Sequence, residues 1–221
     1  MTFPNGDTFE GTYVKCTKEV EKPPAEEGEE EPAPPEPEPE PEPPAEGEEP
    51  AEPAEPAEPP EPETYTTSLR QGKGKYVFAD DKGSYEGEYV DGKRSGVGAL
   101  ILPDGSKYEG AFEDDVIQGE GKYTYPSGDV YQGAFTNGKK DGVGSYFFKA
   151  SASTFMGTWE KGAFVEGEWV LRDGSTYKGP FKDGKPIGEG AYTWAKTGNV
   201  QIGTWNEDGS FNGGVVETVA A

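Results

Sequence analysis

Apolar and polar residues alternate along most of the chain with a period of two, which is typical of β-strands. In YEGEYV, from residue 85, two tyrosines and a glycine share one face and two glutamates share the other. Residues 96–102 alternate in the same way. Between them, DGK at 91–93 supplies residues that accept the left-handed backbone of a tight turn. The pattern therefore predicts a β-hairpin.

This hairpin recurs along the chain at intervals of 22–24 residues. Copies start at Tyr85, Tyr108, Tyr131, Phe155 and Tyr177, and a degraded copy, QIGTWNEDGSFNGG, starts at Gln201. The turn sequences PDGS and PSGD separate neighbouring copies. Because a single hairpin is only marginally stable in water, we expect each copy to be stabilised by its neighbours.

Aromatic residues recur at four positions of the repeat, and these four columns contain 23 of the 27 aromatic side chains. The first column is Phe9, Tyr85, Tyr108, Tyr131, Phe155 and Tyr177. The second column is Tyr13, Tyr89, Phe112, Phe135, Trp159, Phe181 and Trp205. The third column is Tyr76, Leu100, Tyr123, Tyr146, Trp169 and Tyr192. The fourth column is Phe3, Phe78, Leu102, Tyr125, Phe148, Leu171 and Trp194.

A glycine lies between the first and second columns in every copy: Gly11, Gly87, Gly110, Gly133, Gly157, Gly179 and Gly203. We expect a ring from a neighbouring strand to fill the space that the missing side chain leaves. Aromatic neighbours of this kind gain about 0.5–1.5 kcal/mol per pair beyond the burial of their area.

Rings of the first two columns form the candidate site, a face on which the repeats pack or a partner binds. This candidate site consists of Tyr85, Tyr89, Tyr108, Phe112, Tyr131, Phe135, Trp159, Tyr177, Phe181 and Trp205.

A Pro/Glu-rich segment interrupts the first hairpin. Residues 2–14, TFPNGDTFEGTYV, align without a gap with TYPSGDVYQGAFT at 124–136, and RQGKGKYVF from Arg70 supplies the matching second strand. Between them, residues 23–63 contain 17 Glu and 16 Pro, with no Lys or Arg. Such a segment is expected to be disordered, extended and polyproline-like. The sequence thus predicts the first part of the array at 1–14, a disordered insertion in a hairpin turn at 15–70, repeats at 71–209, and a degraded terminal repeat and tail at 210–221.

The net charge of −23 comes mainly from that insertion, since the rest of the chain carries only −6. An acidic balance argues against nucleic-acid binding, which needs a basic face. The chain has no apolar run long enough for a membrane span and no signal-peptide pattern at its start, and its single cysteine, Cys16, cannot form an internal disulfide. We therefore expect a reducing, intracellular compartment.

Candidate chemistry is sparse. The chain has no histidine, which removes the usual general base and the commonest metal ligand. The GKGK and GEGK stretches are interpreted as hairpin glycines rather than phosphate loops. We expect no catalytic residues, no metal and no cofactor. Basic residues are expected in the hairpin turns, as a solvated edge that could also meet an anionic surface: Lys93, Arg94, Lys139, Lys140 and Lys185.

The recurring YEGEYVDGKRSGVG…PDGSKYEG resembles the MORN repeat over about 150 residues. The resemblance implies an all-β fold, a single-layer, twisted antiparallel sheet of consecutive hairpins with an open, grooved face. It also implies a function in docking, because the chain is similar to the small MORN proteins of ciliary and flagellar axonemes, above all those of the radial spoke head. The implied partners are other spoke-head proteins or another MORN protein, in a homo- or heterodimer.

Two other functions compatible with the resemblance remain open. One is a membrane tether that binds anionic lipid, although the acidic balance weighs against it. The other is a regulatory subunit of a separate enzyme, because some lipid kinases and a lysine methyltransferase carry such repeats. The expected location is the cytoplasm and cytoskeleton, in the axoneme.

Overall fold

The computed structural model describes residues 1–19, 64–214 and 216–217. The chain divides into two units, one comprising residues 1–14 and 68–221 and the other residues 15–67. In the second unit the described residues belong to two strands, the end of β1 (Thr8–Glu19) and the beginning of β2 (Thr64–Val77). Both strands extend into the range of the predicted insertion at 15–70, because β1 ends at Glu19 and β2 begins at Thr64. The Pro/Glu-rich segment, residues 23–63, lies outside the described residues.

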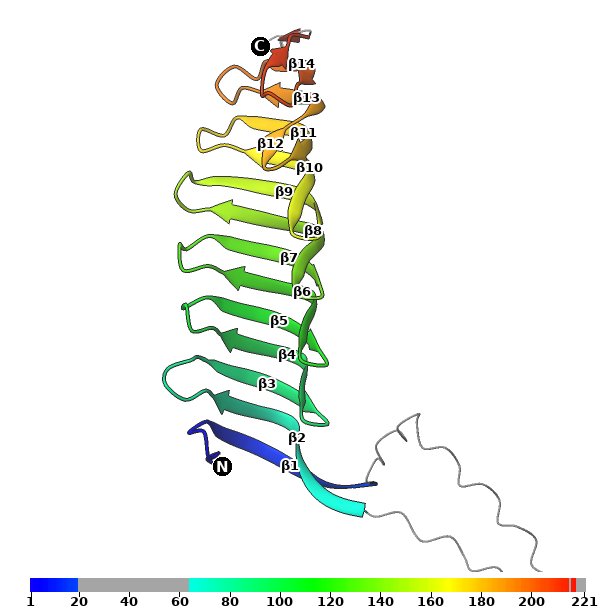
Figure 1. The fold of residues 1–221 in the computed structure, drawn as a ribbon. Coiled ribbons are helices and arrows are strands. Elements are labelled where there is room, and N and C mark those ends of the chain that lie inside the picture. Colours follow the sequence, from blue (N-terminus) through cyan, green and yellow to red (C-terminus); the bar gives the residue numbers. More distant parts are fainter. Residues whose placement is uncertain (20–63, 215, 218–221) are drawn as a thin grey trace, which may run out of the picture. The chain divides into compact units, whose positions relative to one another are not determined.

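The first unit is one antiparallel sheet in which consecutive strands lie side by side, as Figure 1 shows. After β1 and β2 the strands are β3 (Ser84–Val90), β4 (Lys93–Ile101), β5 (Lys107–Glu113), β6 (Val116–Thr124), β7 (Val130–Thr136), β8 (Lys139–Phe148), β9 (Ser153–Glu160), β10 (Ala163–Val170), β11 (Thr176–Lys182), β12 (Lys185–Pro186), β13 (Gly188–Thr193), β14 (Val200–Trp205), β15 (Phe211–Asn212) and β16 (Val216–Glu217). β12 pairs only with β11, and β16 pairs with β14. The described residues contain no helix. The predicted fold class, a single-layer antiparallel sheet of consecutive hairpins that does not close, is confirmed.

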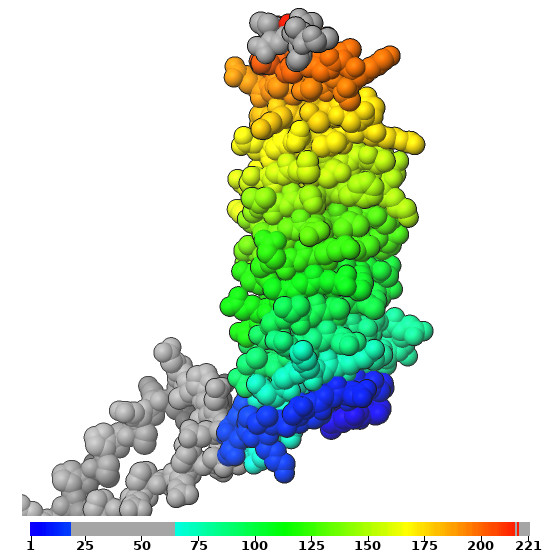
Figure 2. Space-filling view, turned by 180° about the vertical axis from the view of Figure 1, so that it is seen from behind, coloured from blue at the N-terminus to red at the C-terminus, as the bar shows by residue number. Residues whose placement is uncertain are grey.

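The strand register aligns the repeats. Tyr108 on β5 pairs with Tyr123 on β6, and Gly110 pairs with Gly121, so that a first-column residue faces a third-column residue and glycine faces glycine. First-column residues also face third-column residues in the hairpins that begin at residues 85, 131, 155 and 177. Glycine faces glycine in the hairpins that begin at residues 85, 131 and 155. In the space-filling view the side chains accordingly stack in bands that follow the sequence (Figure 2).

The hairpin turns use two successive residues with positive φ, the geometry of a type I′ turn. Asp91 and Gly92 have φ values of 49° and 84°, and Asn137 and Gly138 have 50° and 73°. The turn between β9 and β10 places Lys161 in the same conformation, with φ 48°. These turns match the right-handed twist of the strands, which explains why DGK and NGK recur there.

Bulges set the length of each repeat. Between the pairs Gly87–Gly98 and Glu88–Ser95, β4 contains two residues that have no partner on β3. The hairpin of β9 and β10 has only one such residue, between Phe164 and Glu166. A two-residue bulge keeps the alternation of faces in step, whereas a one-residue bulge reverses it. The copy with the 22-residue spacing is therefore the one in which the faces shift.

Candidate functional site

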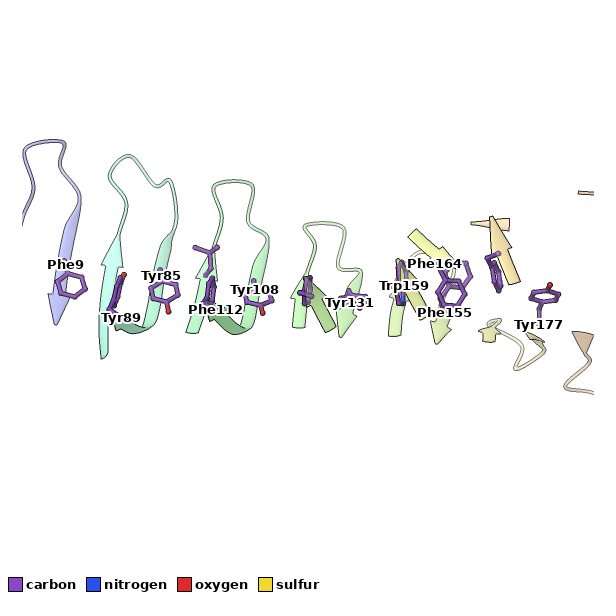
Figure 3. Packing of buried hydrophobic residues seen from close by; sticks show 13 residues of the cluster. Phe9, Tyr85, Tyr89, Tyr108, Phe112, Tyr131, Phe155, Trp159, Phe164 and Tyr177 are labelled. Atoms are coloured by element: carbon purple, nitrogen blue, oxygen red, sulfur yellow. The ribbon is translucent and has the colours of Figure 1, made fainter. Parts of the chain in front are cut away.

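Rings of the first two columns form one continuous row along the sheet, from Phe9 to Tyr177 in Figure 3. In most copies a ring of one hairpin contacts a ring of the next edge to face, whereas Phe155 and Phe181 are tilted at 54°. Tyr85 and Phe112 lie 5.1 Å apart at 87°, and Tyr108 and Phe135 lie 5.3 Å apart at 86°. The row continues through Tyr177 and Trp205, whose centroids are 4.8 Å apart. Because the quadrupoles of aromatic rings favour this edge-to-face arrangement, the row links successive hairpins into one structure.

The paired glycines leave room for the tyrosine that stands two residues before the first glycine of the pair. A Cβ on Gly98 would lie 2.6 Å from Cε2 of Tyr85, and a Cβ on Gly87 would lie 2.7 Å from its Cζ. In these copies the expectation that a ring from a neighbouring strand fills this space was wrong, because the tyrosine lies back over the glycine pair of its own hairpin. At Gly203 the expectation holds, because the ring of Phe211 on the neighbouring strand β15 takes the space. From its place over the glycine pair, the Tyr85 hydroxyl donates a hydrogen bond of 3.0 Å to the carbonyl of Glu88, opposite the bulge.

The same hydrogen bond recurs in three other hairpins. Tyr108 donates to the carbonyl of Ala111 at 2.9 Å, and Tyr131 donates to that of Ala134 at 3.0 Å. Tyr177 makes the equivalent contact at 3.3 Å. Burial raises the pKa of Tyr108 and Tyr131 to about 12. These hydroxyls are therefore structural donors that stay protonated over the physiological pH range.

Nine of the ten candidate-site residues are buried, and Trp205 is half-buried. The structure thus brings all ten into the packed row, where their surfaces are occupied by neighbouring rings. A partner on this side of the sheet would instead reach the third and fourth columns. Those rings are mostly half-buried, including Tyr76, Phe78, Tyr125, Tyr146 and Trp194.

Phe164 belongs to the buried row, although no column contains it. Its ring stacks on Phe155 at 4.6 Å and 9°, and lies 4.8 Å from Phe181. A Cβ on Gly167 would lie 2.9 Å from Phe164, so this ring takes the place that the tyrosines take in other copies. Counting alternate residues back from Trp169 places Phe164 on the opposite face, because the one-residue bulge reverses the count.

Three cations lie on the same aromatic face. Arg70 is 5.0 Å from the Tyr89 ring centroid and 5.2 Å from that of Tyr76. Arg94 is 5.5 Å from Phe112. The prediction that Arg94 and Lys140 form part of a solvated edge was therefore wrong, because their side chains lie over rings of the aromatic face and are half-buried. Strand alternation could have placed both side chains on the aromatic face, since Arg94 and Lys140 each stand an even number of residues before an inward-facing glycine.

Lys140 is surrounded by three rings. Its Nζ lies 4.2 Å from the centroid of Trp159, 4.7 Å from Tyr146 and 5.6 Å from Tyr131. Burial lowers the pKa of its ammonium group, and attraction to the ring faces opposes that cost. The other three residues of the predicted basic edge behave as expected, because Lys93, Lys139 and Lys185 are exposed.

An open pocket of about 340 Å³ lies at the N-terminal part of this face. Its lining combines the rings of Tyr76, Phe78, Tyr85 and Tyr89 with Arg70, Arg94 and Asp115. Asp115 orients Arg94 by accepting hydrogen bonds of 2.9 Å from its backbone N–H and 3.0 Å from Nε. The pocket therefore offers ring surface together with a net positive charge.

Within the described part of the chain, no group of three or more His, Cys, Asp or Glu side chains is placed to hold a metal ion. The same residues contain no helix that could span a membrane.

Comparison with protein families matches the MORN repeat at residues 68–82, 85–107, 108–130, 131–150 and 177–198. The copy that starts at Phe155, which has the one-residue bulge, is not among the matched segments. Comparison with curated proteins finds no match.

Solved structures of low similarity include the SAS-4 (dCPAP) TCP domain of Drosophila melanogaster in complex with a proline-rich motif of Ana2 (dSTIL). It is 12% identical with a TM-score of 0.41, over 65% of this chain and 84% of that chain. The TCP10 domain of Danio rerio CPAP, in complex with a peptide of Danio rerio STIL, is 16% identical with a TM-score of 0.28. That match covers 66% of this chain and 76% of the other.

Proteins with MORN repeats are generally non-enzymatic scaffolds, and the repeats suggest a role in protein interaction or membrane binding. Four of the five matched segments supply rings of the buried row, and the row also contains Phe9, Phe155, Trp159 and Phe164, which lie outside the matched segments. This chain therefore carries MORN repeats.

Proposed function

We propose that this protein is a non-enzymatic scaffold that docks protein partners in a ciliary or flagellar axoneme, within the radial spoke head. The observation that carries the docking function is the open aromatic face. All described strands belong to one sheet, so none of the described residues forms a second layer over the half-buried rings of the third and fourth columns. Aromatic rings beside arginine, as found near Arg70 and Arg94, are enriched in protein interfaces.

The axonemal assignment is supported by the sequence resemblance to small axonemal MORN proteins. In this proposal the buried row keeps the sheet rigid, and the outer rings contact other spoke-head proteins or a second MORN protein. Rigidity reduces the entropy lost on binding, because few side chains need to be ordered. The protein would then be found in the cytoskeleton of the cilium, held by protein contacts.

Fractionation of the tagged protein in a ciliated host tests the assignment. Mild detergent removes the membrane, and the axoneme is then washed with increasing salt. Retention on the demembranated axoneme, with release only by strong salt, is the expected result. Release together with the membrane would contradict it and would favour the membrane-binding role instead.

Two neighbouring phenylalanines provide a matched pair of variants for the docking face. Phe148 on β8 packs beside Tyr146 on the aromatic face, with centroids 4.5 Å apart, whereas Phe147 is 40% exposed on the other face. Phe148→Ala should weaken retention on the axoneme, and Phe147→Ala should not. Thermal unfolding of both variants must lie well above the assay temperature, so that a loss of retention reports on docking. Equal retention of the two variants would show that the aromatic face is not the docking surface.

A further inference from the structure

One repeat position carries the cations of the aromatic face. In five hairpins a residue of the second strand pairs with the second-column ring, as Arg94 pairs with Tyr89 and Lys140 with Phe135. From the N-terminal to the C-terminal hairpins this position holds Arg70, Arg94, Ile117, Lys140, Phe164 and Pro186. The positive charge is therefore confined to the hairpins between β2 and β8.

Two of these cations have no carboxylate partner among the described residues. Arg94 forms an ion pair with Asp115 at 3.0 Å. Arg70 instead donates a hydrogen bond of 2.8 Å to the carbonyl of Gly92, and the Nζ of Lys140 lies beside three rings. Neither cation has an acidic group of the described residues within 4.0 Å. A cation held on partly desolvated ring surface gains more from a carboxylate than a fully hydrated one does.

Rings and cations in this arrangement define the chemistry of a ligand. Aromatic grooves bind proline-rich segments, because the polyproline II conformation is already extended and loses little entropy on binding. Cations between the rings add a requirement for acidic residues beside the prolines. The matching ligand is an extended peptide of alternating proline and glutamate.

We propose that this face binds the Pro/Glu-rich segment of the protein, residues 23–63. The proposal rests on the proposed function of the face as a docking surface for polypeptide. The segment has the required chemistry, with 17 Glu, 16 Pro and no Lys or Arg. Its attachment to the sheet also raises its effective concentration into a range where weak contacts are populated.

The lengths agree. Six strand spacings from β2 to β8 separate Arg70 from Lys140, which corresponds to about 29 Å. Eleven residues in the polyproline II conformation extend about 34 Å, so that PPEPEPEPEPP at 34–44 is long enough to reach both cations. Its four glutamates provide carboxylates along the whole distance.

Zero-length cross-linking of the full chain tests the proposal, because a carbodiimide joins a lysine amine to a carboxylate only when the two are in contact. Peptide mass spectrometry would count the links between residues 23–63 and two lysines. Lys140 lies on the aromatic face and is half-buried, whereas Lys122 is exposed on the other face. Lys22, next to the segment in sequence, confirms that the reaction has worked.

We expect links from the segment to Lys140 to exceed those to Lys122 about tenfold, equivalent to a preference of about 1.4 kcal/mol. Arg70→Gln should lower the yield at Lys140 about two- to fivefold, because it removes one charge contact. The matched control Lys73→Gln, on the other face of the same strand, should leave the yield unchanged. An equal mixture of ¹⁴N- and ¹⁵N-labelled protein shows whether the segment comes from the same molecule or a second copy, and either source supports the proposal.

Equal yields at Lys140 and Lys122, or links at Lys22 alone, would overturn the proposal by showing that the segment contacts lysines without regard to the aromatic face. The experiment uses the purified protein alone. Its failure therefore leaves the axonemal assignment intact, and release of the protein with the membrane would leave a positive cross-linking result intact.

Discussion

A single methyl group on Gly110 should destabilise the sheet. Gly110 on β5 faces Gly121 on β6, and the ring of Tyr108 lies over both. A Cβ at Gly110 would lie 2.5 Å from the Gly121 Cα, 2.5 Å from the Tyr108 hydroxyl and 2.6 Å from the Glu120 carbonyl oxygen. Two of these three atoms belong to backbone that is held in the strand ladder. The ring must therefore move, or the two strands must separate.

The magnitude follows from three contributions to the free energy of unfolding. Overpacking costs about 1–3 kcal/mol. Displacing the Tyr108 ring also breaks its hydrogen bond to Ala111, which contributes about 1 kcal/mol. Replacing glycine by alanine within a strand returns about 0.5–1 kcal/mol of backbone entropy. The net loss for Gly110→Ala is about 1–3.5 kcal/mol, which corresponds to a fall in Tm of about 2–14 °C for a domain of this size.

Urea unfolding followed by circular dichroism measures this loss. Gly213→Ala is the matched control, because the nearest atom to its Cβ would be a Phe211 ring carbon at 3.8 Å. The control should unfold at the midpoint of the parent protein. If Gly110→Ala also lay within about 0.5 kcal/mol of the parent, the usual range for surface substitutions, the packing of tyrosine over paired glycines would not be what stabilises the hairpins.

Three further predictions concern the turns, the tyrosines and the insertion. Lys161→Asn should raise the free energy of unfolding by about 1 kcal/mol in urea titrations, because asparagine accepts a φ of 48° more readily than lysine, and an unchanged midpoint would count against turn strain. Burial raises the pKa of Tyr85, Tyr108 and Tyr131 to about 12. The contribution of these protonated hydroxyls to the free energy of unfolding should therefore be complete below pH 10 and fall as the pH rises towards 12. Urea midpoints that are equal at pH 9 and pH 11 would contradict this. Deleting residues 23–63 should leave the far-ultraviolet circular dichroism of the sheet unchanged, because loop-closure entropy depends only weakly on length, and an unfolded product would show that the segment is needed for folding.

The repeat period, the strand alternation and the turn chemistry together predict most of this fold. Alternation assigns Tyr85, Gly87 and Tyr89 to one face, and repetition then extends that assignment through the copies. The strand register also follows, because a shift by one residue would expose every ring of the row. These features are local or periodic, so the sequence contains them directly.

Features that depend on bulges could not be predicted in the same way. Phe164 joins the buried row because its hairpin has one extra residue where the others have two. The number of bulge residues depends on how both strands pair, and alternation within one strand does not record it. Which glycine a tyrosine covers is likewise a matter of side-chain direction, which the spacing of residues leaves undetermined.

The residue that pairs with the second-column ring makes the N-terminal part of the aromatic face chemically different from the C-terminal part. The N-terminal hairpins present Arg70, Arg94 and Lys140 beside the rings, whereas the later hairpins present Phe164 and Pro186. At this position an acidic segment would meet cations only between β2 and β8, whereas Phe164 and Pro186 offer it no charge. The buried row is nearly uniform along the sheet because its rings join one hairpin to the next. The position of Arg70, Arg94 and Lys140 is not required for that packing and can vary. Variation at this one position can therefore fix where a ligand binds along a repetitive sheet while the packing of the repeats stays the same.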